Sequence, residues 1–195
     1  YDESSDDPTE PPASSAEAIP ASEAADGPED VLMVMDLADS RDVLEEFYQE
    51  ADEHLGNIEA ALLGIEEDPD NPEPIRSMFR SFHTIKGVAG FLDLVPIRTL
   101  AHEIETLLDL IRSDRMAFSA DTINLVLESR DRLHLLVQQV LTGLNENRQP
   151  DEIVPVGDLI LRAQKVIASE NEVDSEGAKP ALDLEGESLS FGEMS

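Results

Sequence analysis

The chain has 195 residues with no cysteine and no tryptophan, and 44 Asp and Glu against 13 Lys and Arg give a formal net charge of −31. Such a charge argues against binding to nucleic-acid phosphates, which needs clustered Lys and Arg, and against anionic membrane surfaces. Without cysteine, disulfide scaffolds and thiolate metal sites are excluded. No apolar run reaches the ~20 residues of a membrane-spanning helix and no signal segment opens the chain, so we expect a cytoplasmic protein. The first residue is Tyr1 rather than Met, which favours a fragment of a longer protein.

The acidic residues are concentrated at the two ends. Residues 1–38 hold eleven Asp and Glu and neither Lys nor Arg, and residues 169–195 hold eight Asp and Glu with Lys179 as their single base. Segments this polar bury too little apolar surface to offset the entropy of ordering them. We therefore predict disordered acidic tails at 1–37 and 169–195 around a folded domain at 38–168. The pattern leaves open what the apolar run at 31–35 does.

Between the tails, apolar residues recur at helical spacing and no stretch alternates as a half-buried strand does. Four apolar stripes follow in chain order, over residues 43–62, 75–85, 97–111 and 123–141. Asp39 and Ser40 offer N-cap oxygens before the first stripe, and Ser119 does so before the fourth. Gly143, near the end of the fourth stripe, and Pro150 beyond it are read as stop signals for the fourth helix.

A further, shorter helix is predicted from about Pro155 to Ala168. Four long amphipathic helices joined by short loops predict an all-α fold, an antiparallel four-helix bundle with this shorter fifth helix. His54 and His134 belong to no motif in the pattern and are expected at the surface or boundary of the bundle. Phe79 and Phe82 are expected in packing rather than in base stacking, because no basic patch surrounds them.

One segment of the second helix combines polar residues and glycines on one side. His83, Lys86, Gly87 and Gly90 have the spacing i, i+3, i+4 and i+7, which places them on one helix face. Each glycine costs about 1 kcal/mol relative to alanine in a helix interior. The pattern predicts a histidine beside a groove cleared of side chains, with an ammonium group one turn away, where an anionic group would find space and positive charge.

The third helix adds a second pair, His102 and Glu105, at i and i+3. A carboxylate close to His83 would accept a hydrogen bond from its Nδ1–H and leave Nε2 as the nucleophile. It would also stabilise the positive charge that the ring gains on bonding to phosphorus. Helical periodicity alone does not establish that Glu105 makes this contact.

These motifs resemble those of histidine phosphotransfer (HPt) domains. Residues 83–90, His-Thr-Ile-Lys-Gly-Val-Ala-Gly, are similar to the H-x-[IL]-K-G-x-x-G core of the family. Residues 102–105, His-Glu-Ile-Glu, match the H-x-x-E of the HPt (P1) domain that opens CheA-type chemotaxis histidine kinases. The similarity covers roughly residues 38–168. Many relatives have glycine ten residues after the histidine, where this chain has Asp93, and this difference affects how the second helix ends.

The resemblance implies that His83 accepts a phosphoryl group at Nε2 from a separate ATP-binding kinase domain and passes it to an aspartate of a response-regulator receiver. By position, Glu105 would orient His83, Lys86 and His102 would complete the polar network, and Gly87 and Gly90 would leave room for the phosphoryl group and the partner. The chain would be the phosphoacceptor module of a histidine kinase, monomeric by itself and phosphorylated in trans within a dimer of the parent. ATP and Mg would belong to the kinase domain, and this chain would hold no cofactor.

Two alternatives to a kinase-attached module stay open from the sequence. One is a free-standing relay intermediate. The other is a non-catalytic helical docking module whose acidic tails bind a basic partner. A di-iron bundle would need two Glu-x-x-His motifs and two further glutamates, whereas this chain has one pair in the reverse order, so no metal site is expected.

Overall fold

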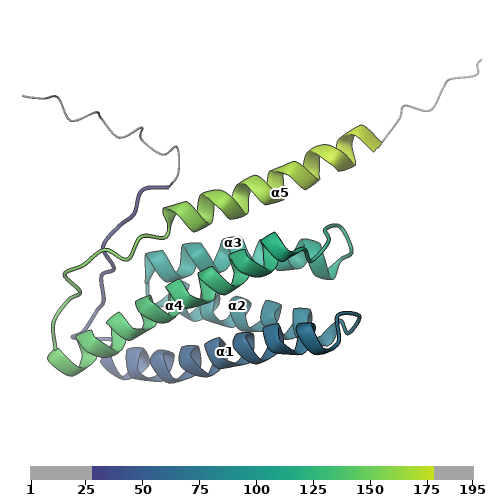
Figure 1. Ribbon diagram of the computed structural model, residues 1–195. Helices are drawn as coiled ribbons and strands as arrows, with labels where there is room; N and C mark the ends of the chain where they lie inside the picture. The colour runs from purple at the N-terminus through teal and green to yellow at the C-terminus, as the bar shows by residue number, and fades with distance from the viewer. Residues whose placement is uncertain (1–27, 178–195) are drawn as a thin grey trace, which may run out of the picture.

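The computed structural model describes residues 28–177, which form five α-helices and no strand. These are α1 (Arg41–Glu67), α2 (Glu73–Phe91), α3 (Val95–Arg112), α4 (Ala120–Glu146) and α5 (Gly157–Gly177). Each of α1 to α4 contacts the next, α4 contacts α1, and α5 lies along α3 and α4 (Figure 1). The predicted all-α four-helix bundle is confirmed. None of these five helices is long and apolar enough to cross a bilayer.

The core is built from one apolar stripe of each helix. Its largest fully buried side chains include Phe47, Leu55, Met78, Phe82 and Ile104. Burying a side chain of this size contributes roughly 1.5–3 kcal/mol relative to leaving it in water. Phe82 precedes His83 directly, so packing of the core fixes the part of α2 from which the histidine projects.

The fourth helix ends between Gly143 and Pro150, but Gly143 is not its stop signal, and that part of the prediction was wrong. α4 continues to Glu146 and ends at Asn147, whose φ of 50° is left-handed. Gly143 is instead buried, and a Cβ built on it would collide with the Cε of Met35. The glycine therefore provides space for a methionine that lies more than 100 residues earlier in the chain. At the other end of α4, Ser119 caps the helix as predicted, accepting a hydrogen bond from the backbone of Thr122 at 3.3 Å.

Residues 28–37, here named the leading segment, were assigned to a disordered tail, with the role of the apolar run at 31–35 left open, and the structure corrects this assignment. Met33 and Met35 are each 2% exposed, whereas Val34 between them is 66% exposed. Gln149 binds both backbone groups of Met35: its Oε1 accepts from the Met35 N–H at 2.8 Å, and its Nε2 donates to the Met35 carbonyl at 2.6 Å. Two apolar side chains and a backbone clamp thus hold the segment on the bundle, although its composition is polar.

The leading segment also reaches the start of α5. Asp30 Oδ1 accepts hydrogen bonds from the backbone N–H groups of Val156 at 2.6 Å and Gly157 at 2.8 Å. α5 runs on to Gly177 rather than ending at Ala168, so it is not the short helix expected, because no proline interrupts residues 156–179. The rest of the predicted tails, 1–27 and 178–195, lies outside the described residues.

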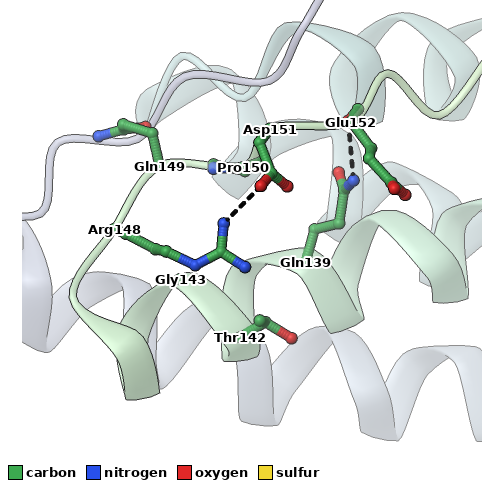
Figure 2. Close-up of a pocket in the computed structure, with 8 residues that line it drawn as sticks. All are labelled: Gln139, Thr142, Gly143, Arg148, Gln149, Pro150, Asp151 and Glu152. Carbon is green, nitrogen blue, oxygen red and sulfur yellow. Dashed lines mark hydrogen bonds and ion pairs between the residues drawn. The ribbon is translucent and has the colours of Figure 1, made fainter.

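The connection between α4 and α5 is tied back to α4 (Figure 2). Gln139 donates its side-chain amide to the carbonyl oxygen of Glu152 at 2.9 Å, and Arg148 pairs with Asp151 at 2.9 Å. These side chains line a polar pocket at the C-terminal end of α4. Together with Gln149, they fix the loop against which the leading segment lies.

Candidate functional site

His83 of α2 lies against Glu105 of α3, with Nδ1 and Oε1 2.8 Å apart. The His83 side chain is 63% exposed, whereas that of Glu105 is 12% exposed. An ionised carboxylate only accepts hydrogen bonds, so Nδ1 carries the proton, and in the neutral imidazole Nε2 then has the lone pair. The contact between Glu105 and His83, which helical periodicity could not establish, is therefore present. The ring of His83 stays largely exposed, and its Nε2 is available as a nucleophile.

Lys86 completes the environment of the carboxylate. Its Nζ lies 2.7 Å from the second oxygen, Oε2, of Glu105, and its side chain is 27% exposed. Burial works to raise the pKa of Glu105, but hydrogen bonds and charges from His83 and Lys86 outweigh this, so the pKa falls below its usual 4.5. Glu105 is therefore a carboxylate at neutral pH, held by one partner on each oxygen.

Phe79 lies one helical turn before His83 and stacks on it. The two ring centroids are 6.1 Å apart and the ring planes differ by 19°. The guanidinium carbon of Arg112, at the end of α3, lies 3.9 Å from the centroid of Phe79. Asp109 pairs with Arg112 at 2.7 Å. The imidazole is thus restrained by a hydrogen bond on its edge and by an aromatic neighbour.

The two glycines of the motif differ in their surroundings. A Cβ on Gly87 would have no other atom within 4 Å, whereas a Cβ on Gly90 would lie 3.4 Å from Cδ of Arg98, in ordinary contact. Gly87 therefore leaves α2 open to solvent one turn after His83, and the stem of an arginine from α3 covers Gly90. Packing within the described chain does not require a glycine at either position.

The remaining histidines do not join His83. His102 is 59% exposed, and its Nδ1 lies 4.0 Å from Glu103, so it is not part of the His83–Glu105–Lys86 network that it was expected to complete. It borders the same shallow depression as Lys86 and Glu105. His54 and His134 are half-buried, as expected for boundary residues. Residues 28–177 contain no group of three His, Asp or Glu placed to hold a metal ion.

Asp93 ends α2 in the backbone geometry that usually takes glycine. Its φ is 53°, in the left-handed region, and its N–H donates to the carbonyl of Gly90 at 3.4 Å. The N–H of Leu94 donates to the carbonyl of Ala89 at 2.9 Å, and Leu94 is buried. This pair of bonds is a Schellman motif, in which aspartate is tolerated with some strain. The change from glycine therefore leaves the end of the helix intact.

Three features near the site were not predicted from the sequence. Phe79 was assigned to packing alone, although its position four residues before His83 allows contact on a helix. Arg112 reaches Phe79 from another helix, and no local spacing indicates that contact. Phe91 is 79% exposed at the end of α2, where a phenyl ring is usually covered.

Comparison with known proteins places these features in a family. The model of the Hpt domain family matches residues 42–143. The chemotaxis protein CheA of Rhizobium meliloti is 37% identical over 105 residues, which is 54% of this chain and 14% of that protein. The chain thus spans a small part of the length of this relative.

Two solved structures share the fold. The CheA phosphotransferase domain from Thermotoga maritima has a TM-score of 0.50 and 29% identity, over 52% of this chain and 96% of that one. The phosphorylated P1 domain of CheA3 from R. sphaeroides, solved in complex with CheY6, has a TM-score of 0.55 and 20% identity, over 66% of this chain and 98% of that one. At 20% identity, the likeness to the CheA3 domain shows a shared fold and no more.

Proposed function

Because the chain belongs to the Hpt domain family, we propose that His83 is a phosphoacceptor that receives a phosphoryl group at Nε2 and passes it on to an aspartate. The observation that carries this proposal is the 2.8 Å contact between Nδ1 of the exposed His83 ring and the carboxylate of Glu105. It fixes the tautomer in which Nε2 is free to attack phosphorus.

In the first step, the Nε2 lone pair attacks the γ-phosphorus of ATP held by a kinase domain. An N–P bond forms as the bond between phosphorus and the ADP oxygen breaks, and the imidazole becomes positively charged. Glu105 stabilises this charge through the hydrogen bond from Nδ1. Lys86 holds the other carboxylate oxygen, so Glu105 keeps its position while the charge on the ring changes.

In the second step, an aspartate oxygen of a receiver domain attacks the phosphorus. The N–P bond breaks, its electron pair returns to Nε2, and the neutral imidazole is restored without transfer of a proton. Transfer between two carriers needs close, in-line approach, and the open side of α2 at Gly87 provides the room for it.

The partners follow from the relatives, of which this chain spans a small part. We place the ATP-binding kinase domain in the same parent protein, acting in trans within a dimer, and the receiver in a separate chemotaxis regulator. ATP and Mg²⁺ belong to the kinase domain, and this chain needs no cofactor. Since the reaction uses ATP, the proposal places the domain in the cytoplasm. CheA relatives favour a kinase-attached module over a free-standing relay protein.

The test is labelling by a CheA kinase domain with radioactive ATP. The wild-type chain is expected to take up label that is labile in acid and stable in alkali, and His83→Gln is expected to take up none. His102→Gln is the matched control, because His102 is also on the exposed side of the α2–α3 pair, with 59% of its side chain accessible. Label that persists in His83→Gln, or that is lost in His102→Gln alone, would assign the phosphoacceptor elsewhere.

A further inference from the structure

The plane of the His83 ring decides where its Nε2 lone pair points, because that lone pair lies in the plane of the imidazole. The new N–P bond has to form along this direction. The hydrogen bond from Nδ1 to Glu105 at 2.8 Å fixes one edge of the ring, but the ring is still free to tilt about this bond. The outer torsion of a histidine has broad energy wells, and this side chain is 63% exposed. Holding the plane therefore requires a second contact.

Phe79 provides a second contact one helical turn before His83. The ring centroids are 6.1 Å apart and the ring planes differ by 19°, which is the geometry of an offset stack. Tilting the imidazole would break this stack, so the phenyl ring restricts the motion that the hydrogen bond leaves free. Phe79 is a firm support for the histidine, because it is half-buried and packs against the core.

Phe79 is held in turn by two residues at the end of α3. The guanidinium carbon of Arg112 lies 3.9 Å from the centroid of the phenyl ring, within the range of a cation–π interaction. Nε and Nη2 of Arg112 both lie 2.7 Å from Oδ1 of Asp109. The two side chains are 43% and 51% exposed, and ion pairs this exposed contribute little to stability. The pair does fix the guanidinium over the phenyl ring. Asp109, Arg112 and Phe79 are here named the ring clip.

We propose that Phe79, held by Arg112 and Asp109, is a positioning residue that sets the plane of the His83 ring and so directs Nε2 at the phosphorus. This inference rests on the proposed function and adds groups outside the network of His83, Glu105 and Lys86. The ring clip acts through His83 and forms no bond to phosphorus. Because the direction of Nε2 matters only after the partner has docked, loss of the clip lowers kcat and leaves KM unchanged.

The first test is phosphorylation by a CheA kinase domain with labelled ATP. Phe79→Leu is expected to lower kcat about tenfold and to keep KM within about twofold of wild type, since small errors of orientation are costly in transfer. Phe79→Tyr keeps a flat ring and is expected to restore kcat to within about threefold of wild type. Phe118→Leu is the matched control, because Phe118 is also half-buried against the core but lies between α3 and α4. It should lose similar stability in urea unfolding and keep the wild-type kcat.

The same assay tests the part of the clip that α3 contributes. Arg112→Gln removes the positive charge over Phe79 and is expected to lower kcat about threefold. Arg162→Gln is its control, because Arg162 of α5 forms an ion pair of similar exposure with Glu128, and it should leave kcat unchanged.

Two further measurements respond to the position of the ring and not to stability. In NMR spectra, the ring protons of His83 are expected to carry a ring-current shift from Phe79 that is lost in Phe79→Leu and kept in Phe79→Tyr. Phosphoramidate, a small donor, phosphorylates Nε2 as its own P–N bond breaks and ammonia leaves with the electron pair of that bond. A small donor approaches the ring from any direction, so Phe79→Leu is expected to react within about twofold of the wild-type rate.

The outcomes separate this proposal from the proposed function. If wild type takes no label at His83 from either donor, the proposed function fails, and the ring-current shift still decides whether Phe79 fixes the ring. Equal slowing with phosphoramidate and with the kinase domain would show that Phe79 changes the reactivity of Nε2 rather than its direction, which overturns the proposal. The proposal is also overturned if Phe79→Leu acts through KM, if Phe118→Leu lowers kcat as much, or if the ring protons of His83 do not shift in Phe79→Leu.

Discussion

Nδ1 of His83 and Oε1 of Glu105 lie 2.8 Å apart across the contact between α2 and α3, one residue largely exposed and the other largely covered. We predict that Glu105→Gln slows phosphorylation of His83 by about tenfold to a hundredfold, because a hydrogen bond to a charged group contributes roughly 1.5–3 kcal/mol. The amide that replaces the carboxylate also carries an N–H, which can donate to Nδ1 instead of accepting from it. Initial rates with a kinase domain and labelled ATP measure the effect. Circular dichroism should show an unchanged bundle, and Glu103→Gln on the same helix should keep the wild-type rate.

The lowered pKa of Glu105 makes part of the stability depend on pH. An acid with a lower pKa in the folded than in the unfolded protein stabilises the fold above its unfolded value, near 4.5. This contribution is lost as the pH falls through the lower folded pKa. Urea unfolding should therefore give wild type a higher free energy of unfolding than Glu105→Gln at about pH 7. The gap between these two free energies should narrow below about pH 4.5. A gap that is constant with pH would show that the carboxylate is not held by its two partners.

We predict that Gly87 lowers the stability of the domain and keeps this face of α2 open. Because a Cβ at Gly87 would meet no atom within 4 Å, Gly87→Ala should stabilise the domain by about 1 kcal/mol. The same methyl group should slow phosphoryl transfer by standing beside His83. Gly56→Ala is the control, since Gly56 lies inside α1 with equally open surroundings. It should raise the unfolding free energy by a similar amount and leave transfer unchanged; a slowing in both variants would point to stiffening rather than to blockage.

Asp93 is predicted to be a strained position. Its left-handed φ of 53° favours glycine, so Asp93→Gly should raise the unfolding free energy by roughly 0.5–1 kcal/mol, after the entropy cost of glycine. Asp114, which ends α3 with a φ of 57°, should respond in the same way to Asp114→Gly. Chemical denaturation of both variants provides the measurement. A loss of stability at either position would mean that the aspartate side chain contributes more than its backbone strain costs.

Met35 is buried although it lies in an acidic segment, and we predict that it contributes to stability as a core residue does. Met35→Ala should lower the unfolding free energy by about 2–4 kcal/mol, because it empties the space beside Gly143. Val34→Ala, at a side chain that is 66% exposed, should change it by less than about 0.5 kcal/mol. Equal effects of the two substitutions in urea titrations would show that the leading segment is not held on the bundle.

The sequence predicts those parts of the molecule in which neighbours in space are also neighbours along a helix. The apolar stripes of α1 to α4 and the shared face of His83 and Gly87 follow from the 3.6-residue period. Gly143 was misread because the local rule makes it a helix stop, whereas its actual neighbour, Met35, is more than 100 residues away. The stacking of Arg112 on Phe79 and the position of His102 outside the network depend on how α2 and α3 pack, which no spacing within one helix determines.

The capping of α5 by Asp30 has a consequence for the order in which the domain forms. The hydrogen bonds that hold the leading segment join residues 114 to 127 positions apart. During synthesis, the leading segment leaves the ribosome before α1 to α4, whereas its hydrogen-bond partners are made after these helices. The hydrogen bonds of the leading segment therefore form only after α1 to α4 have been made, and this early segment is among the last to complete its native contacts.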